Sequence, residues 1–173
     1  LTLTREPGGT ALAEAIRSLV LGSDFAPETI IPETELLLFF AARAQHIHYV
    51  IKPALQRGDW VLCDRFTETS YAYQGGGRML SLDRIAKLEN WVLGSFKPDL
   101  TFLLDISVEI GMTRVEARNA KDRIEQEERA FFERVRSVFI ERSKIYPDRI
   151  KLINAERSVD EIQTQIQSII ELL

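Results

Sequence analysis

Short apolar runs along this chain alternate with longer segments in which apolar residues recur every three or four positions. The runs "WVLCD" and "LTFLLD" are continuous and end in a carboxylate, which is typical of buried parallel strands. Between the runs, spacings such as Leu12, Ile16 and Leu19 place apolar side chains on one face of a helix. Strands that alternate with helices in this way predict an α/β domain with a mainly parallel sheet.

Local signals set the bounds of the expected elements. Thr10 can cap a helix that ends at Gly22, and Ser158-x-x-Glu161 is a capping box for the last helix. The glycines of "YQGGGR" are expected to break the short helical piece before them and form a turn. The expected strands cover residues 1–4, 60–64, 100–105 and 149–154, and the expected helices cover residues 11–21, 35–56, 81–93, 107–117, 126–144 and 158–170.

Size and composition bound the class of protein. The chain has 173 residues, 45% of them hydrophobic, which suffices for one domain with an ordinary core. A net charge of −4 argues against a nucleic-acid backbone as the main partner, because such binding needs a basic face. The apolar run 36–42 is too short to span a bilayer. The single cysteine, Cys63, has no zinc-site spacing to other ligands. We therefore expect a cytoplasmic protein with neither nucleic acid nor membrane as partner.

The junction after "WVLCD" carries the first candidate site. Ligands of parallel sheets bind at the carboxyl ends of the strands, and Asp64 and Arg65 stand at such an end. A carboxylate here can hold a hydrated Mg²⁺ ion, and a guanidinium can form two hydrogen bonds to a phosphate. The alternative is an acidic residue that only caps the next helix.

An aromatic residue and an arginine form the second candidate site. Phe39 and Arg43 are four residues apart, so they share one helix face and could stack on a nucleobase and bond its edge. The alternative is that Phe39 is an ordinary core residue. His46 and His48 are two apart and point in different directions on a helix, so we interpret both as structural.

Arginines are frequent in the helix expected at 126–144 and in the residues just before it. Arg118 and Arg123 bracket the polar stretch "NAKD", and arginines over a phosphate site stabilise phosphoryl transfer. The arginines from Arg129 to Arg136 are interleaved with glutamates, which favours a salt-bridged helix face in solvent.

Six motifs stand in one order along the chain, and together they resemble the thymidylate kinase family, whose members transfer the γ-phosphoryl group of ATP to dTMP. They are "TREPGGT", "FFAARAQ", "VLCDR", "TSYAYQGGGR", "PDLTFLLD" and "DRIEQE". The arginines of "EARNAKDRIE" look like those of the bacterial variety, which keeps its catalytic arginines in a lid, here about residues 114–126. The resemblance implies one kinase domain over residues 1–173. Its implied fold is a three-layer α/β/α fold of the P-loop nucleoside monophosphate kinase type, in which four of five parallel strands lie in this sequence.

The resemblance assigns roles around dTMP to nine positions. The implied roles are stacking on thymine, hydrogen bonding to the base edge, contact with the phosphate, and packing against the sugar where a ribose 2′-hydroxyl would clash. Phe39 would stack on thymine, Arg43, Ser70 and Gln74 would bond the base edge, Arg65 and Arg17 would contact the phosphate, and Tyr73 would pack against the sugar. Glu6 and Pro7 would border the monophosphate.

On the ATP side, the resemblance implies a Mg²⁺ ion that binds with ATP and that Asp64 contacts through water. Arg118 and Arg123 would close over the transferring phosphoryl group. The residues implied beside the adenine are Arg114, Asn154 and Ala155. Members of the family pair through helices, so a homodimer is implied as well, with ATP and dTMP as substrates.

The glycines of "REPGGT" do not form a phosphate loop. The stretch does not match G-x-x-x-x-G-K-[ST], and neither G-K-S nor G-K-T occurs in the sequence. The resemblance therefore implies an N-terminally incomplete chain, with the phosphate loop on about 30 further residues before Leu1, the size of a βα unit. Two alternatives stay open. One is another P-loop deoxynucleoside or nucleotide kinase, and the other is a nucleotide-binding fragment that is inactive without a P-loop.

Overall fold

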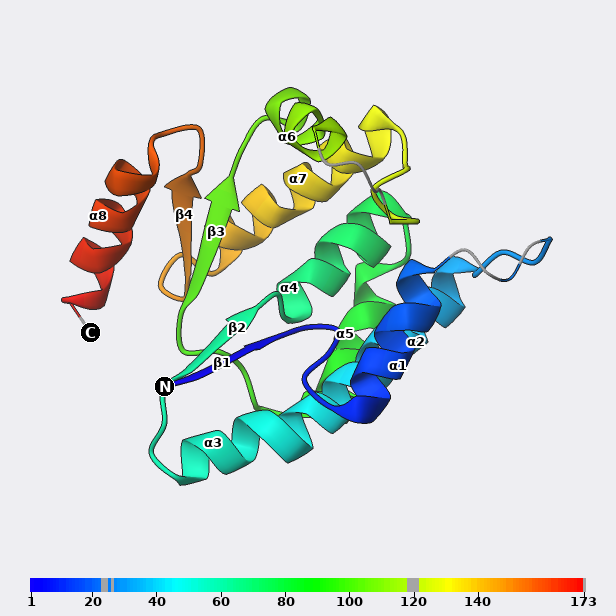
Figure 1. The fold of residues 1–173 in the computed structure, drawn as a ribbon, viewed down its shortest axis with the longest axis horizontal. Helices are drawn as coiled ribbons and strands as arrows, with labels where there is room; N and C mark the ends of the chain where they lie inside the picture. Colours follow the sequence, from blue (N-terminus) through cyan, green and yellow to red (C-terminus); the bar gives the residue numbers. More distant parts are fainter. Residues whose placement is uncertain (23–24, 26, 118–121, 173) are drawn as a thin grey trace.

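The structure is a computed structural model that describes residues 1–22, 25, 27–117 and 122–172. In this part of the chain, strands and helical segments alternate (Figure 1). The strands are β1 (Thr2–Arg5), β2 (Val61–Asp64), β3 (Thr101–Asp105) and β4 (Ile150–Asn154). The helical segments are α1 (Ala11–Leu21), α2 (Pro32–His46), η1 (Ile47–Ile51), α3 (Lys52–Gln56), α4 (Thr67–Ser70), η2 (Tyr71–Gly77), α5 (Leu82–Leu93), α6 (Val108–Glu116), α7 (Arg129–Ile145) and α8 (Val159–Ile170).

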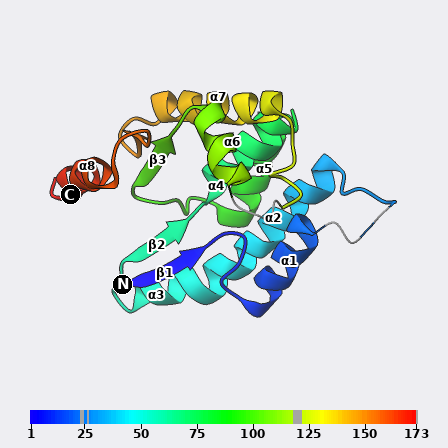
Figure 2. The same ribbon diagram turned by 45° about the horizontal axis from the view of Figure 1, so that its top comes forward.

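Parallel pairing joins the strands two by two. β1 pairs with β2, and Arg5 lies opposite Asp64 at the carboxyl end. β3 pairs with β4, and Asp105 lies opposite Asn154. The expected parallel direction is confirmed, and within the described residues the strands form two pairs rather than one continuous sheet. β2 is the strand of the first pair that lies nearer to β3, and the two pairs stand apart (Figures 1 and 2).

Helices cover both strand pairs. α3 lies beside β1 and β2, and α7 lies behind β3 and β4 in the view of Figure 1. α7 packs against β3 and β4 and also against η2, so it joins the β3–β4 pair to the helical segment that follows β2 and α4. α8 packs against β4 at the outer side of that pair.

The local helix signals are confirmed. The hydroxyl of Thr10 accepts a hydrogen bond from the N–H of Ala13, and α1 ends before Gly22. Ser158 and Glu161 form the capping box of α8 in both directions. Two starts differ by three residues: α7 begins at Arg129, after the expected start, and α2 begins at Pro32, before it.

The long helix that begins at Pro32 is not α-helical throughout. Its turn Ile47–Ile51 is π-helical, and the N–H of Lys52 bonds the carbonyl of Ile47 five residues back. Pro53 follows directly and has no N–H to donate. A widened turn lets the chain pass this proline without ending the helix.

The expected turn at "YQGGGR" is wrong. Tyr71–Gly77 is instead a π-helical segment that continues α4. A Cβ on Gly76 would lie 2.8 Å from the carbonyl oxygen of Arg134, and a Cβ on Gly77 would overlap the ring of Phe131. The glycines therefore allow α7 to lie directly against η2, and this close approach explains them better than a turn does.

Two apolar clusters form the core, and α2 contributes to both. Phe39 belongs to the cluster that contains Val20 and Phe131, whereas Phe40 packs with Ile85 in the other cluster. Neighbouring residues of one helix point about 100° apart, so α2 can fill both clusters. Among the described residues, no helix has the length and apolar character needed to cross a membrane.

Candidate functional site

A buried ion pair joins the end of β1 to α2. The carboxylate of Glu6 accepts a hydrogen bond of 2.7 Å from Nε of Arg43, and both side chains are almost fully buried. Glu6 also meets Nδ1 of His46 at 3.1 Å, and Nε2 of that ring lies 2.6 Å from the hydroxyl of Thr4. Because a carboxylate only accepts, Nδ1 carries the proton of this contact. His46 thus fixes Glu6, and Glu6 fixes Arg43.

The same face of α2 meets α4 and η2. Nη1 of Arg43 donates to the hydroxyl of Ser70 at 3.2 Å. Phe39 lies four residues before Arg43, and Gln74 lies four residues after Ser70, so each pair shares one helix face. All four side chains are buried. The structure therefore brings together the four residues that were predicted to address a base.

Gln74 carries an unpaired acceptor in this cluster. Its Nε2 donates to Glu35 at 2.9 Å. Its Oε1 is buried and has no hydrogen-bond partner among the residues that the structure describes. An unpaired buried acceptor costs about 1–3 kcal/mol, so a donor from a ligand would be favourable here.

Arg65 follows β2 with an unusual backbone conformation. Its φ of +66° lies in the left-handed region, which residues with a side chain rarely adopt. Its guanidinium lies 5.4 Å from the centre of the Tyr73 ring. Desolvation lowers the pKa of Arg65, but Tyr73, Asp64 and Asp122 outweigh it and the net shift is upward. Backbone strain of this kind clusters at functional sites. Asp64 and Arg65 are both exposed at this end of β2.

The loop after β1 is closed by α1. Nη1 of Arg17 donates to the carbonyl of Pro7 at 3.1 Å. The N–H of Gly9 donates to Glu14 at 3.0 Å, and this bond lowers the pKa of Glu14. Pro7 and Arg17, both predicted near the monophosphate, therefore lie together next to Glu6.

The carboxyl ends of β3 and β4 border an open cavity of about 730 Å³. Arg136 and Asp105 lie on the wall of this cavity. Nε and Nη2 of Arg136 donate to the two carboxylate oxygens of Asp105 at 2.7 and 2.8 Å. Asn154 lines the cavity too, and the N–H of Ala155 bonds the carbonyl of Asp105 at 2.7 Å. Arg114, the third residue predicted near adenine, is exposed on α6.

The arginines of α7 depart in part from the solvent-facing pattern that was expected. Arg129 does pair with Glu133 in solvent, at 2.7 Å and four residues along the helix. Arg134 instead donates to the carbonyls of Gly76 and Gly77, and Arg136 reaches Asp105. These partners are far away in sequence, so charge patterning along one helix does not reveal them.

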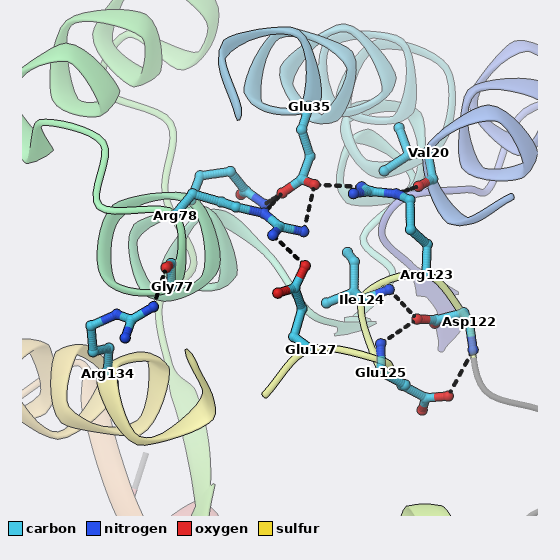
Figure 3. A network of polar contacts seen from close by, with 11 residues as sticks. Val20, Glu35, Gly77, Arg78, Asp122, Arg123, Ile124, Glu125, Glu127 and Arg134 are labelled. Carbon is cyan, nitrogen blue, oxygen red and sulfur yellow. Dashed lines mark hydrogen bonds and ion pairs between the residues drawn. The ribbon is translucent and has the colours of Figure 1, made fainter. Parts of the chain in front are cut away.

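The predicted lid is partly described. Arg118 lies outside the described residues. Arg123 donates through Nη2 to Glu35 on α2 and through Nε to the carbonyl of Val20, the latter at 2.9 Å (Figure 3). Ile124 is buried in the first core cluster. This end of the segment predicted as a lid is therefore bonded to α1 and α2.

Glu35 is the residue that the sequence analysis missed. It is 1% exposed and binds Gln74, Arg78 and Arg123. Burial raises the pKa of Glu35, but the hydrogen bonds from Arg123, Gln74 and Arg78 outweigh burial and hold the pKa below its usual value. The available signal was spacing, because Glu35 stands four residues before Phe39 on the same helix face.

The described residues offer few metal ligands. No group of three His, Cys, Asp or Glu side chains in this part of the chain could hold a metal ion. Mg²⁺ in phosphoryl-transfer sites keeps several waters and needs only one or two carboxylates besides the phosphates. The exposed carboxylate of Asp64 at the end of β2 suits that mode of binding.

Comparison with known proteins decides the family. The family model for thymidylate kinase matches residues 1–166. The chain belongs to the thymidylate kinase family. A thymidylate kinase of Ruthia magnifica subsp. Calyptogena magnifica is 58% identical over 171 residues, which are 99% of this chain and 82% of that protein. A thymidylate kinase of Pseudomonas syringae pv. tomato is 55% identical over 172 residues, 99% of this chain and 81% of that protein.

A solved structure of the same family supports the fold. The crystal structure of thymidylate kinase from Ehrlichia chaffeensis matches with a TM-score of 0.76 at 30% identity, over 98% of this chain and 79% of that chain. The resemblance drawn from six motifs is confirmed, and so is the α/β fold of the P-loop kinase type. None of these matches favours a deoxynucleoside kinase or a non-catalytic nucleotide-binding fragment.

Proposed function

We propose residue roles for the reaction of this family, in which ATP phosphorylates dTMP to dTDP. The family assignment supports the reaction itself. One observation carries the residue roles, namely the convergence of Phe39, Arg43, Ser70 and Gln74 from two facing helices beside the carboxyl ends of β1 and β2. In a parallel α/β protein this is where a ligand binds.

The base subsite follows from donors and acceptors. Thymine presents O4 as an acceptor and N3–H as a donor. Arg43 supplies a fixed donor, because Glu6 and Ser70 hold its guanidinium in place. The oxygen of Gln74 supplies the acceptor. Phe39 stacks on the ring, since aromatic faces attract each other in offset geometry.

The phosphate and sugar subsites adjoin it. Arg65 and Arg17 bind the dTMP phosphate, because guanidinium groups form paired hydrogen bonds to phosphate oxygens. Glu6 and Pro7 border that subsite, and Pro7 already accepts a hydrogen bond from Arg17. Tyr73 lies beside Arg65, where its ring would exclude a ribose 2′-hydroxyl.

The ATP side uses the end of β2 and the ends of β3 and β4. Asp64 would hold Mg²⁺ through water, and the ion would neutralise charge on the phosphates of ATP. Arg118 is the arginine that we assign to the transferring phosphoryl group. We assign Arg123 to anchoring the lid instead, because Glu35 and Val20 occupy its Nη2 and Nε. Adenine is assigned to the cavity at β3 and β4, which Asn154 lines. Ala155, the next residue, and Arg114 on α6 are assigned to flank the adenine ring.

We further propose a cytoplasmic homodimer that pairs through a helical face. Leu37 on α2 and Trp91 on α5 are largely exposed and line one shallow groove with Leu36 and Leu88. Large exposed apolar side chains of this kind mark association surfaces. Light scattering of the wild type and of Trp91→Glu would test this assignment, which requires a dimer that the substitution weakens.

The reaction is tested by ADP release from ATP and Mg²⁺ with the full-length gene product. The acceptors dTMP, thymidine and dAMP are assayed in parallel. Release with dTMP alone supports the proposed function. Faster turnover of thymidine would point to a deoxynucleoside kinase, and no release with any acceptor would contradict the assignment as an active kinase.

A further inference from the structure

Glu35 is saturated with donors. Its Oε1 accepts from Nε2 of Gln74 at 2.9 Å and from Nε of Arg78 at 3.3 Å. Its Oε2 accepts from Nη2 of Arg78 at 3.2 Å and from Nη2 of Arg123. Figure 3 shows Arg78 and Arg123 reaching the carboxylate from opposite sides. An ionised carboxylate offers about four acceptor positions, so these four contacts use its capacity.

The surrounding groups keep Glu35 an acceptor only. Two guanidinium groups contact it, and a second carboxylate, Glu127, binds the remaining Nη1 of Arg78. Each group on this carboxylate therefore donates, and none of them can accept a proton from it. A neutral, protonated Glu35 would lose charge-assisted bonds to Arg78 and Arg123.

This chemistry fixes the orientation of one amide. A glutamine side chain has a donor end and an acceptor end of almost the same shape. Only the donor end can face an ionised carboxylate, so Nε2 of Gln74 must point at Glu35 and Oε1 must point away from it. Oε1 is the buried atom that lacks a hydrogen-bond partner in the described part of the chain.

We propose that Glu35 is a specificity-determining positioning residue, which locks the amide of Gln74 so that only its oxygen is offered to the base. The proposal rests on the proposed function, in which Gln74 addresses the edge of thymine. An oxygen at this point suits a base with an N3–H donor, as in thymine and uracil. It repels cytosine, whose N3 is an acceptor. Glu35 would therefore act on acceptor choice without touching the acceptor.

The test compares three acceptors on the full-length protein. kcat/KM is measured for dTMP, dUMP and dCMP with the wild type and with Glu35→Gln. The new glutamine can donate or accept, so it would allow the amide of Gln74 to turn. In Glu35→Gln we expect the value of kcat/KM for dTMP, divided by the value for dCMP, to fall on the order of tenfold. The wild type rejects dCMP through a hydrogen-bonding mismatch at N3, and a turned amide would remove this mismatch.

dUMP separates this role from a structural one. Its base has the same N3–H and O4 edge as thymine, so the ratio for dTMP over dUMP should not change in Glu35→Gln. General damage to the pocket would lower all three rates and leave both ratios unchanged. Glu127→Gln is the matched control, because it removes a carboxylate from Arg78 but leaves the contact between Glu35 and Gln74.

The outcomes distinguish the two proposals. A wild type that does not phosphorylate dTMP overturns the proposed function. A wild type that prefers dTMP to dCMP, together with an unchanged preference in Glu35→Gln, overturns the role of Glu35 alone. If Glu35→Gln does not fold, a neutron crystal structure of the wild type with dTMP decides, because it locates the hydrogens that distinguish the nitrogen of an amide from its oxygen. It must show Oε1 of Gln74 at the base and Nε2 on Glu35, and the reverse arrangement contradicts the proposal.

Discussion

Two carboxylates at strand ends of this molecule each pair with an arginine from a helix, and one pair is buried whereas the other is exposed to solvent. Arg43 is 2% exposed and its partner Glu6 is 3% exposed. Arg136 is 41% exposed beside the open cavity, with Asp105 at 20%. Their closest N···O distances are both 2.7 Å. Burial therefore distinguishes the two pairs, and a buried pair becomes costly to break because one charge is left unpaired.

The largest effect is expected from breaking the buried pair. Arg43→Ala leaves Glu6 buried without its cation and should lower the free energy of unfolding by about 3–5 kcal/mol. Urea unfolding followed by circular dichroism measures this change. Arg57→Ala is the control, because Arg57 pairs with Asp59 in solvent and its loss should change stability little. Equal effects of the two substitutions would remove burial as the explanation.

The next effect concerns catalysis at the same end of the molecule. Arg65→Ala removes a phosphate-binding guanidinium and should lower kcat/KM for dTMP on the order of 10²–10³-fold, as loss of one charge-stabilising group does. Steady-state kinetics with the full-length protein measures it. Arg129→Ala, which removes a solvent pair on α7, serves as the control. Unchanged kinetics in Arg65→Ala would contradict the assignment of the phosphate subsite.

A smaller effect on stability is expected at the contact between η2 and α7. Gly77→Ala places a methyl group 2.4 Å from the nearest ring atom of Phe131 and should cost about 1–3 kcal/mol of stability through overpacking. Gly111→Ala on α6 is the matched control. A Cβ there meets Ile106 at an ordinary 3.7 Å, so alanine should be neutral or stabilise by up to about 1 kcal/mol. Thermal unfolding compares the two variants, and equal midpoints would show that η2 and α7 can separate at little cost.

The smallest effect completes the comparison of arginines. Arg136→Ala breaks a pair that water can replace, and should change stability by less than about 1 kcal/mol. The same urea experiment measures it. A loss as large as that of Arg43→Ala would mean that the pair with Asp105 is shielded from solvent far more than its exposure indicates.

Local elements of this fold could be predicted because their signals lie within a few residues. The capping box of Ser158 and Glu161 and the helix end at Gly22 need only neighbouring residues. The strand ends at Asp64 and Asp105 were equally visible as apolar runs closed by a carboxylate. The residues predicted around the base also came together, since helical spacing related Phe39 to Arg43 and the family resemblance supplied Ser70 and Gln74.

Features that depend on distant partners could not be predicted. The three glycines of η2 look like a turn in sequence, but Gly75 lies against Leu82 and Ile85 of α5, and Gly76 and Gly77 lie against α7. Glu35 and Arg123 are bonded although 88 positions separate them. A charged residue in an amphipathic helix is usually solvated, so its sequence neighbours give no reason to expect burial.

The position of α7 has a consequence for how the molecule comes apart. The helix packs on β3 and β4 with one part of its surface and on η2 with another. Arg142 from α7 and Arg149 from the turn before β4 both bind Glu68 on α4, the latter at 2.7 Å. The β3–β4 pair and the segment formed by α4 and η2 therefore share α7, and neither can lose this packing without exposing a surface of the same helix. The β3–β4 pair and the segment formed by α4 and η2 should therefore unfold together, in one cooperative transition.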